Sequence, residues 1–330
     1  MNSFELIPTE ENLIHTLDKD LLKRNKDLVR FYDLILVQEG ASSIAIDGRW
    51  GSGKTFFVKQ SMLLINAKNP MSDMDDEKKA SIVYALPFPK KAEDMPENYD
   101  VAVYYDAWEN DNGTDPVLSL VYEIIKQLGI NYAFDDNSNA FKLAGSVLEA
   151  LTGRNINGII ENLKSDNPLT KMKEEKDLHE NIKNFFTELL VERGNRLVVF
   201  IDELDRCKPS YAVQLLERIK HYLYDDRITF VFSVNLGELQ HTIKHYYGNT
   251  FDACRYLDRF FDMRISLPPA DKTAFYREMG LESSYVLEKI CRKVIDTYNM
   301  ELREATRFYR QVKTAAYEPT HESRKFDFSF

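Results

Sequence analysis

Apolar residues in the first part of the chain repeat at helical spacing and then change to a short strand-like run. The helical repeat covers residues 9–38 and stops at Gly40, so residues 1–40 are predicted to form a helical segment. The apolar run at 42–47 predicts a strand, and helical spacing returns over 54–66. A strand followed directly by a helix is therefore expected early in the chain.

Strands and helices alternate strictly in the second half. Strands are predicted at 197–202, 228–234 and 263–267, and helices at 209–223, 237–247 and 252–261. Such alternation predicts a parallel sheet covered by helices on both faces, so the expected fold is α/β, a three-layer domain with a mainly parallel central sheet. After Pro268 and Pro269 the predicted elements are helices at 271–279, 283–299 and 301–315.

The pattern between these regions is weaker. Residues 68–100 contain several prolines and an acidic cluster, and we interpret them as a surface insertion with a short strand at 81–86. Beyond it, the predicted elements are a strand at 101–105 and helices at 116–128, 140–151, 156–164 and 178–191. The expected organisation is an N-terminal helical segment at 1–40, a core at 41–269 with irregular or helical insertions at about 68–100 and 130–175, and a small C-terminal helical bundle, or lid, at 270–330.

Composition narrows the class of protein. Of 330 residues, 44% are hydrophobic and 29% charged, as in folded domains. No apolar stretch approaches a membrane span, and the N-terminus lacks a signal-peptide layout. Three widely spaced cysteines suit reduced thiols, so a cytoplasmic location is expected. The net charge of −10 disfavours nucleic acid binding by the whole surface but leaves a local basic patch open.

Residues 48–55 read Gly-Arg-Trp-Gly-Ser-Gly-Lys-Thr and lie between the predicted strand and helix. In this G-x-x-x-x-G-K-T pattern, glycines let backbone N–H groups surround phosphate oxygens, and the next helix points its positive end at the anion. Lys54 is expected to reach the β- and γ-phosphates, and Thr55 to hold Mg²⁺. The alternative is a glycine-rich turn without function. The predicted nucleotide contacts are Gly48, Trp50, Gly51, Ser52, Gly53, Lys54, Thr55 and Phe56.

Two carboxylates, Asp202 and Glu203, stand at the end of the predicted strand 197–202, where ligands bind in open α/β sheets. Asp202 is expected to hold Mg²⁺ together with Thr55. Glu203 is expected to orient and polarise an attacking water. An ordinary strand ending in an acidic turn is the alternative, but the phosphate loop upstream favours the catalytic interpretation.

Asn235 ends the next predicted strand and has two interpretations. Its side chain is placed to touch the γ-phosphate or the water, which we favour because it stands at a strand end. It also suits the N-cap of the following helix, and both roles are compatible.

Arginines near the end of the core are candidates for neutralising charge on a transferred phosphoryl group. Arg259 is the first choice for a finger supplied to a neighbouring subunit, with ion pairs from Asp258 to Arg255 or Arg259 as the alternative. Arg303 is a candidate lid arginine that reaches back to the phosphates, with a solvated helix face as its alternative. Two other residues have structural expectations. Trp108 is expected to pack rather than to stack on a nucleotide, and Cys207 is expected to be a buried thiol and not a nucleophile.

Five motifs occur in a characteristic order: Gly-x-Trp-Gly-x-Gly-Lys-Thr, Asp-Ala-Trp, Phe-Ile-Asp-Glu-Leu-Asp-Arg-Cys-x-Pro, Tyr-Leu-Asp-Arg-Phe-Phe with Ile-Ser-Leu-Pro, and Leu-Arg-Glu-Ala-Thr-Arg-Phe. With them, nearly the whole chain resembles the KAP family of P-loop NTPases. The resemblance implies the additional-strand, catalytic-glutamate class of NTPase fold with a C-terminal helical bundle. Members of that family are often linked to bacterial defence against phage or mobile elements, or to membrane-associated scaffolding.

The sequence departs from the family pattern in two ways. Many relatives insert transmembrane helices between the loop and the acidic strand, whereas residues 130–175 are polar here, so no membrane span is expected. The second acidic position, often Asp in the family, is Glu203, which suits water activation better. The chain also ends soon after the helical bundle, so we expect a separate effector protein.

The leading hypothesis is a Mg²⁺-dependent ATP hydrolase that acts as a switch or assembly factor and self-associates as a homo-oligomer. ATP is the default nucleotide because no Asn/Thr-Lys-x-Asp guanine-reading motif is present. The alternatives are a nucleotide-gated scaffold with little hydrolysis, a nucleic-acid-processing subunit, which no basic stripe supports, and a small-molecule kinase.

Overall fold

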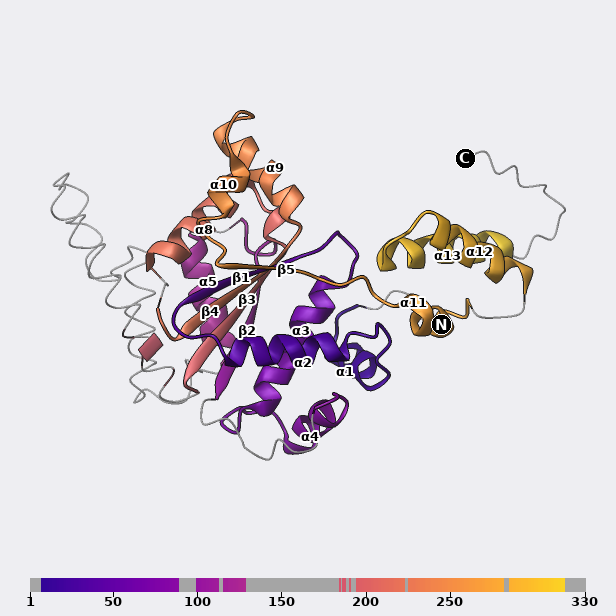
Figure 1. The fold of residues 1–330 in the computed structure, drawn as a ribbon, viewed down its shortest axis with the longest axis horizontal. Coiled ribbons are helices and arrows are strands. Elements are labelled where there is room, and N and C mark those ends of the chain that lie inside the picture. The colour runs from indigo at the N-terminus through magenta and orange to yellow at the C-terminus, as the bar shows by residue number, and fades with distance from the viewer. Residues whose placement is uncertain are drawn as a thin grey trace.

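The structure is a computed structural model that describes residues 7–88, 99–112, 115–128, 184, 186–187, 190, 194–222, 225–281 and 285–317 (Figure 1). Within them, five parallel strands form one sheet in the order β2-β3-β4-β1-β5. The strands are β1 (Ser42–Asp47), β2 (Asp100–Asp106), β3 (Arg196–Asp202), β4 (Ile228–Val234) and β5 (Met263–Ser266).

The register brings the chemically important strand ends together. Asp47 of β1 lies opposite Val234 of β4, and Asp202 of β3 lies opposite Asp106 of β2. Because all the strands are parallel, their carboxyl ends meet at one edge of the sheet. The phosphate loop and the acidic pair are therefore neighbours, although the sequence separates them widely.

Helices cover both faces of the sheet and confirm the predicted three-layer α/β fold. Along β3, Val199 and Ile201 join the apolar cluster on one face, and Val198 and Phe200 join the cluster on the other. This alternation follows from the two-residue period of a strand, with a helix layer burying each face. The first face is covered by α5 (Pro116–Gln127), α8 (Pro209–Tyr222), α9 (Leu236–Tyr247) and α10 (Ala253–Leu257). The second is covered by α1 (Glu10–Asp18), α2 (Asn25–Leu36), α3 (Lys54–Lys68) and α4 (Asp76–Tyr84).

Two predictions for the N-terminal half are wrong in detail. The helical repeat at 9–38 forms two helices, because the chain turns a corner at Asp20 and Lys23, both with positive φ. The corner is stabilised by the Asn25 side chain, which donates to the Leu17 carbonyl at 2.8 Å. The strand predicted at 81–86 is also wrong, because residues 81–84 form the end of α4, whose N-terminus is capped by Asp75.

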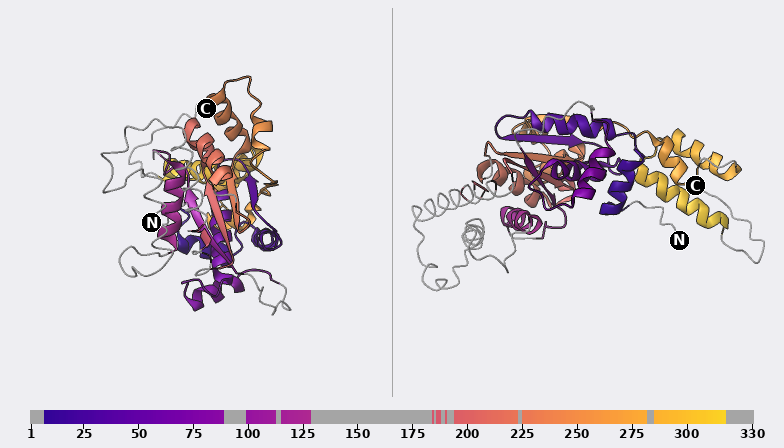
Figure 2. Two further views of the ribbon diagram at one scale, coloured as in Figure 1. Left: turned by 90° about the vertical axis from the view of Figure 1, so that its left-hand side faces the viewer. Right: turned by 90° about the horizontal axis from the view of Figure 1, so that it is seen from below.

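A small helical bundle follows β5, as predicted. It consists of α11 (Lys272–Glu278), α12 (Val286–Thr297) and α13 (Leu302–Tyr317), which pack around their own apolar cluster. Figures 1 and 2 show it beyond one end of the core, next to the N-terminal helices. The contact is specific, since the Asp271 N–H donates to the Leu22 carbonyl at 3.2 Å. The bundle therefore lies near the phosphate loop, which precedes α3.

Some sequence expectations fall outside the described residues. These are the insertion at 130–175, with its helices at 140–151 and 156–164, and most of the helix at 178–191, of which positions 184, 186, 187 and 190 are helical. In the part of the chain that is described, no helix has both the length and the apolar character needed to cross a membrane. The proposed domain boundaries stay predictions.

Candidate functional site

The phosphate loop connects β1 to α3 and is closed on itself. The Lys54 ammonium donates to the carbonyls of Gly48 and Arg49, at 2.6 and 3.2 Å. Gly51 and Gly53 have φ of 80° and 89°, which favour glycine. A Cβ at Gly51 would also lie 3.1 Å from the Cβ of Arg303, so the first turn of α13 packs directly on the loop. The loop thus has the curvature that its sequence predicts, and it lies against the first turn of α13.

Lys54 is nearly buried and surrounded by carboxylates. Its side chain is 8% exposed, and burial lowers its pKa. The nearby carboxylates of Asp205, Asp202, Glu203 and Asp47 oppose that change. The ammonium lies against the loop carbonyls of Gly48 and Arg49, with these four carboxylates nearby.

Asp202 is held rigidly at the end of β3. It is 1% exposed and accepts hydrogen bonds from the Tyr104 hydroxyl at 3.1 Å and from the Glu203 N–H at 3.0 Å. Burial and the adjacent Asp202 carboxylate raise the pKa of Tyr104, so the phenol stays a proton donor. Sequence reasoning missed Tyr104, because a tyrosine within an apolar strand has no signal that separates it from core.

Glu203 follows directly and has a left-handed backbone, with φ 61° and ψ 20°. For a residue other than glycine this conformation is uncommon and is found preferentially at functional sites. Burial first, and then the Asp202 carboxylate, raise the pKa of Glu203 to about 7, while Arg206 opposes the shift. A carboxylate with such a pKa can take up a proton near neutral pH.

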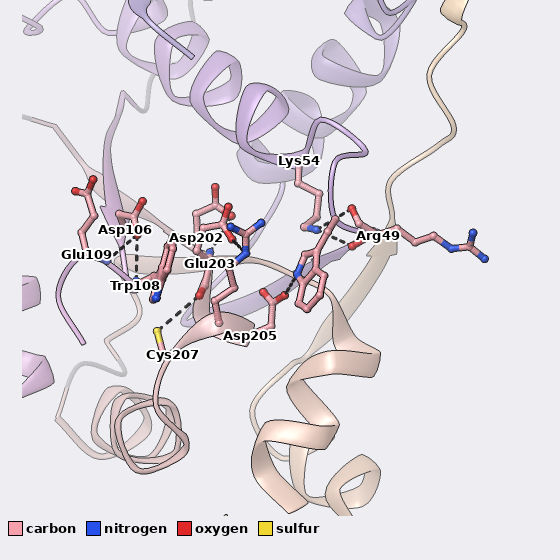
Figure 3. A network of polar contacts seen from close by, with 12 residues as sticks. Arg49, Lys54, Asp106, Trp108, Glu109, Asp202, Glu203, Asp205 and Cys207 are labelled. Carbon is pink, nitrogen blue, oxygen red and sulfur yellow. Dashed lines mark hydrogen bonds and ion pairs between the residues drawn. The ribbon is translucent and has the colours of Figure 1, made fainter. Parts of the chain in front are cut away.

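Asp205 links the acidic turn to the phosphate loop. Its carboxylate accepts the indole N–H of Trp50 at 2.6 Å and is 6% exposed (Figure 3). Burial raises the pKa of Asp205, whereas the Trp50 hydrogen bond and Lys54 oppose this. Trp50 is therefore oriented by a side chain of the acidic turn, and its ring is left 45% exposed.

A cavity of about 440 Å³ opens over these groups. It is lined by Trp50, Gly51 and residues 53–56 of the phosphate loop, by Glu203 and Arg206 of the acidic turn, and by Leu302 and Arg303 of α13. Apolar residues of the N-terminal segment, Leu21 and Leu22, line it too. A second cavity of about 610 Å³ shares Trp50, Gly51, Arg206 and Arg303 with the first. Polar groups thus converge at the loop, and apolar groups lie toward the lid, an arrangement typical of ligand sites.

A family model for the KAP family P-loop domain matches residues 25–318. The chain belongs to the KAP family. A search of curated proteins found no significant match. The family match covers the core and the helical bundle of the KAP domain and confirms the resemblance inferred from the motifs.

The predicted site residues of the KAP domain separate into two groups. Trp50, Lys54, Thr55, Glu203 and Arg303 line the first cavity together. Asn235 caps α9, where its side chain accepts the Glu238 N–H at 3.4 Å, and it lines neither cavity. Arg259 is exposed after α10, away from both cavities. Its predicted partner Asp258 instead pairs with Arg264.

The expectations for Trp108 and Cys207 had opposite outcomes. Trp108 is 51% exposed and lies at the cavity rather than in the core, so the packing interpretation is wrong (Figure 3). Asp106 fixes the turn before it by accepting the N–H groups of Trp108 and Glu109, each at 3.0 Å. Cys207 is a buried thiol with a raised pKa, as predicted for an unreactive cysteine.

Arg24 is a further residue of the site that the sequence did not reveal. Its guanidinium is buried and donates to the carbonyls of Ser52 at 2.8 Å and Pro268 at 2.5 Å. It thereby joins the phosphate loop to the segment that leads from β5 to the lid. Burial lowers the pKa of Arg24 to about 10, and no periodicity or motif marks this position, which just precedes the family match.

Replacing Arg24 by Ala is expected to lower the free energy of unfolding by about 3 kcal/mol, because the carbonyls of Ser52 and Pro268 would each lose a charged donor that is itself buried. Chemical denaturation measures this, and Arg30→Ala is the matched control, since Arg30 is exposed on α2. An unfolding free energy equal to that of the wild type would show that the two bonds contribute nothing.

Proposed function

We propose that this KAP domain binds ATP with Mg²⁺ and hydrolyses it, and that the nucleotide state drives a switch or an assembly step. One observation carries the proposal: the buried Lys54 of the phosphate loop lies beside the carboxylates of Asp202 and Glu203, on a cavity that the lid helix α13 also lines. Binding alone needs no second carboxylate, whereas hydrolysis needs a group that polarises water.

The order of the strands supports the additional-strand, catalytic-glutamate class for this domain. β4 lies between β1, which leads into the phosphate loop, and β3, which ends at Asp202. Asn235 at the end of β4 then stands between the loop and the acidic pair along the sheet edge. The hydrogen bond by which Asn235 caps α9 does not exclude the proposed contact of Asn235 with water or phosphate.

Each residue has a defined task in the proposed reaction. Lys54 gives up its loop carbonyls and binds the β- and γ-phosphates. Thr55 and Asp202 fit Mg²⁺, since Asp202 is a buried carboxylate already held by Tyr104, and the ion would offset the charge of the phosphate oxygens. Glu203 orients water and takes its proton, and Arg303 of the lid approaches the loop at Gly51.

The biological setting is proposed from the family. The family's link to bacterial defence supports an anti-phage role in which this domain controls a separate effector protein. If the bound nucleotide controls self-association, a change of nucleotide would change the assembly of the protein. A nucleotide-gated scaffold with little hydrolysis is the second candidate, favoured by the contact between Glu203 and Arg206, which occupies the carboxylate with an ion pair at 2.6 Å.

Phosphate release by the purified protein, under multiple turnover with ATP and Mg²⁺, tests the proposal. Sustained release is expected. Tight nucleotide binding with no release beyond one equivalent would support the scaffold instead. GTP in place of ATP tests the choice of nucleotide.

The proposed arginine finger makes a separate prediction. If Arg259 completes the site of a neighbouring subunit, turnover per molecule rises with protein concentration, and Arg259→Ala removes that rise. Arg255→Ala is the matched control, because Arg255 is exposed on α10 nearby. A rate independent of concentration in the wild type would eliminate the finger.

A further inference from the structure

Arg206 lies at the centre of the site and has three partners. Its Nε is 2.6 Å from a carboxylate oxygen of Glu203. Its guanidinium carbon lies 5.7 Å from the ring centre of Trp50 and 5.6 Å from that of Trp108. These distances are within the range of cation–π attraction, so two rings and one carboxylate hold the same cation.

The two tryptophans reach Arg206 from different parts of the fold. Trp50 belongs to the phosphate loop and is oriented by Asp205, while Trp108 follows β2 and is oriented by the turn at Asp106. Arg206 itself ends the 3₁₀ turn Leu204–Arg206 that follows Glu203. All three side chains line the first cavity with Lys54 and Thr55. The Arg206 guanidinium thus lies on the cavity in which phosphates are proposed to bind.

The ion pair with Arg206 is unfavourable for catalysis by Glu203. A carboxylate oxygen that accepts a charged hydrogen bond is less available to orient water or to take its proton. A terminal phosphate competes for the same cation, because a guanidinium matches phosphate oxygens with two parallel hydrogen bonds. Arrival of a phosphate in the cavity therefore offers Arg206 an alternative anion.

We propose that Arg206 is a positioning residue that responds to the terminal phosphate, an inference that rests on the nucleotide binding proposed above. Without a triphosphate, its guanidinium holds the Glu203 carboxylate between Trp50 and Trp108. With a nucleoside triphosphate bound, the guanidinium exchanges Glu203 for the γ-phosphate and frees the carboxylate for water. A diphosphate lacks the competing group and leaves the ion pair in place.

The two flanking residues are the only tryptophans of the sequence, so their fluorescence reports on this cluster. In Trp50→Phe, emission comes from Trp108 alone, without the response of the loop tryptophan. Quenching of Trp108 by acrylamide is expected to increase when Mg²⁺ and a non-hydrolysable ATP analogue are added, because Arg206 leaves one face of the ring. ADP with Mg²⁺ is expected to cause no such increase.

Variants of the ion pair provide the controls. In the Trp50→Phe background, Arg206→Met is expected to raise quenching without nucleotide and to abolish the response to the ATP analogue. Glu203→Gln keeps the arginine and is expected to keep the response. In the protein with both tryptophans, Arg206→Met should reduce the preference for the ATP analogue over ADP by about tenfold, the loss of one charged hydrogen bond. Should Arg206→Met fail to fold, Arg206→Lys gives a smaller loss of preference, since it keeps a point charge without the fork.

Calorimetry on the same samples separates the two ideas. Binding of neither nucleotide would refute the proposed function and, with it, the inference. Binding of both nucleotides with the same quenching response, or a response that survives Arg206→Met, would overturn the inference and leave nucleotide binding intact.

Discussion

Replacing Glu203 by Gln is expected to lower the rate of ATP hydrolysis by at least about a hundredfold while nucleotide binding persists. The glutamine side chain has nearly the same shape as the glutamate side chain, but its amide cannot take a proton from water. Glu203 is suited to this task because burial and Asp202 raise its pKa to about 7. Phosphate release and calorimetric affinity for ATP, measured on the same preparation, separate chemistry from binding.

The matched control for this variant is Glu109→Gln. Glu109 lines the same cavity, but it is exposed, and its backbone N–H donates to Asp106. Its replacement should leave turnover near that of the wild type. Unchanged turnover in Glu203→Gln would remove Glu203 from the mechanism.

Replacing Lys54 by Ala is expected to reduce strongly the thermal stabilisation that ATP and Mg²⁺ give to the protein. A ligand stabilises a fold in proportion to the logarithm of its concentration over its dissociation constant, so weaker binding reduces the shift directly. Removal of a charged hydrogen bond to phosphate costs about 1.5–3 kcal/mol, or roughly ten- to a hundredfold in affinity. The ligand-induced shift in Tm is the quantity to measure, since Lys54 also contacts the Gly48 and Arg49 carbonyls.

Lys68→Ala is the matched control for Lys54, because Lys68 lies at the other end of α3 and its ammonium stacks on Phe88. It should retain the full shift with ATP. A full shift in Lys54→Ala as well would contradict the assignment of residues 48–55 as the phosphate-binding loop.

Local sequence signals were sufficient to predict the strands of the sheet. They failed where a local pattern is compatible with both a strand and a helix. The β-strands were predicted because each combines a short apolar run with polar ends, and β3 ends at Asp202 as expected. The run at 81–86 was misassigned because short apolar stretches suit strand and helix alike, and the Asp75 cap decides for α4. The corner at Asp20 and Lys23 was missed because neither residue is a glycine or a proline.

For the site, the sequence predicts the groups that nucleotide chemistry would require at fixed spacing. Lys54, Thr55, Asp202 and Glu203 follow from a loop and a strand end, since parallel strands must deliver their carboxyl ends to one edge. The same residues were enough to indicate the family, which the match over residues 25–318 confirms. These features depend on local backbone geometry, which a short segment encodes.

Contacts between segments that are distant in the chain could not be predicted from the sequence. Arg24 joins the Ser52 and Pro268 carbonyls, Tyr104 holds Asp202, and Arg206 is enclosed by Trp50 and Trp108. Each depends on how distant helices and loops pack against one another, and side-chain packing leaves no periodic trace along the chain. The phosphate loop could therefore be predicted from the sequence, whereas the ion pair between Arg206 and Glu203 could be found only in the tertiary structure.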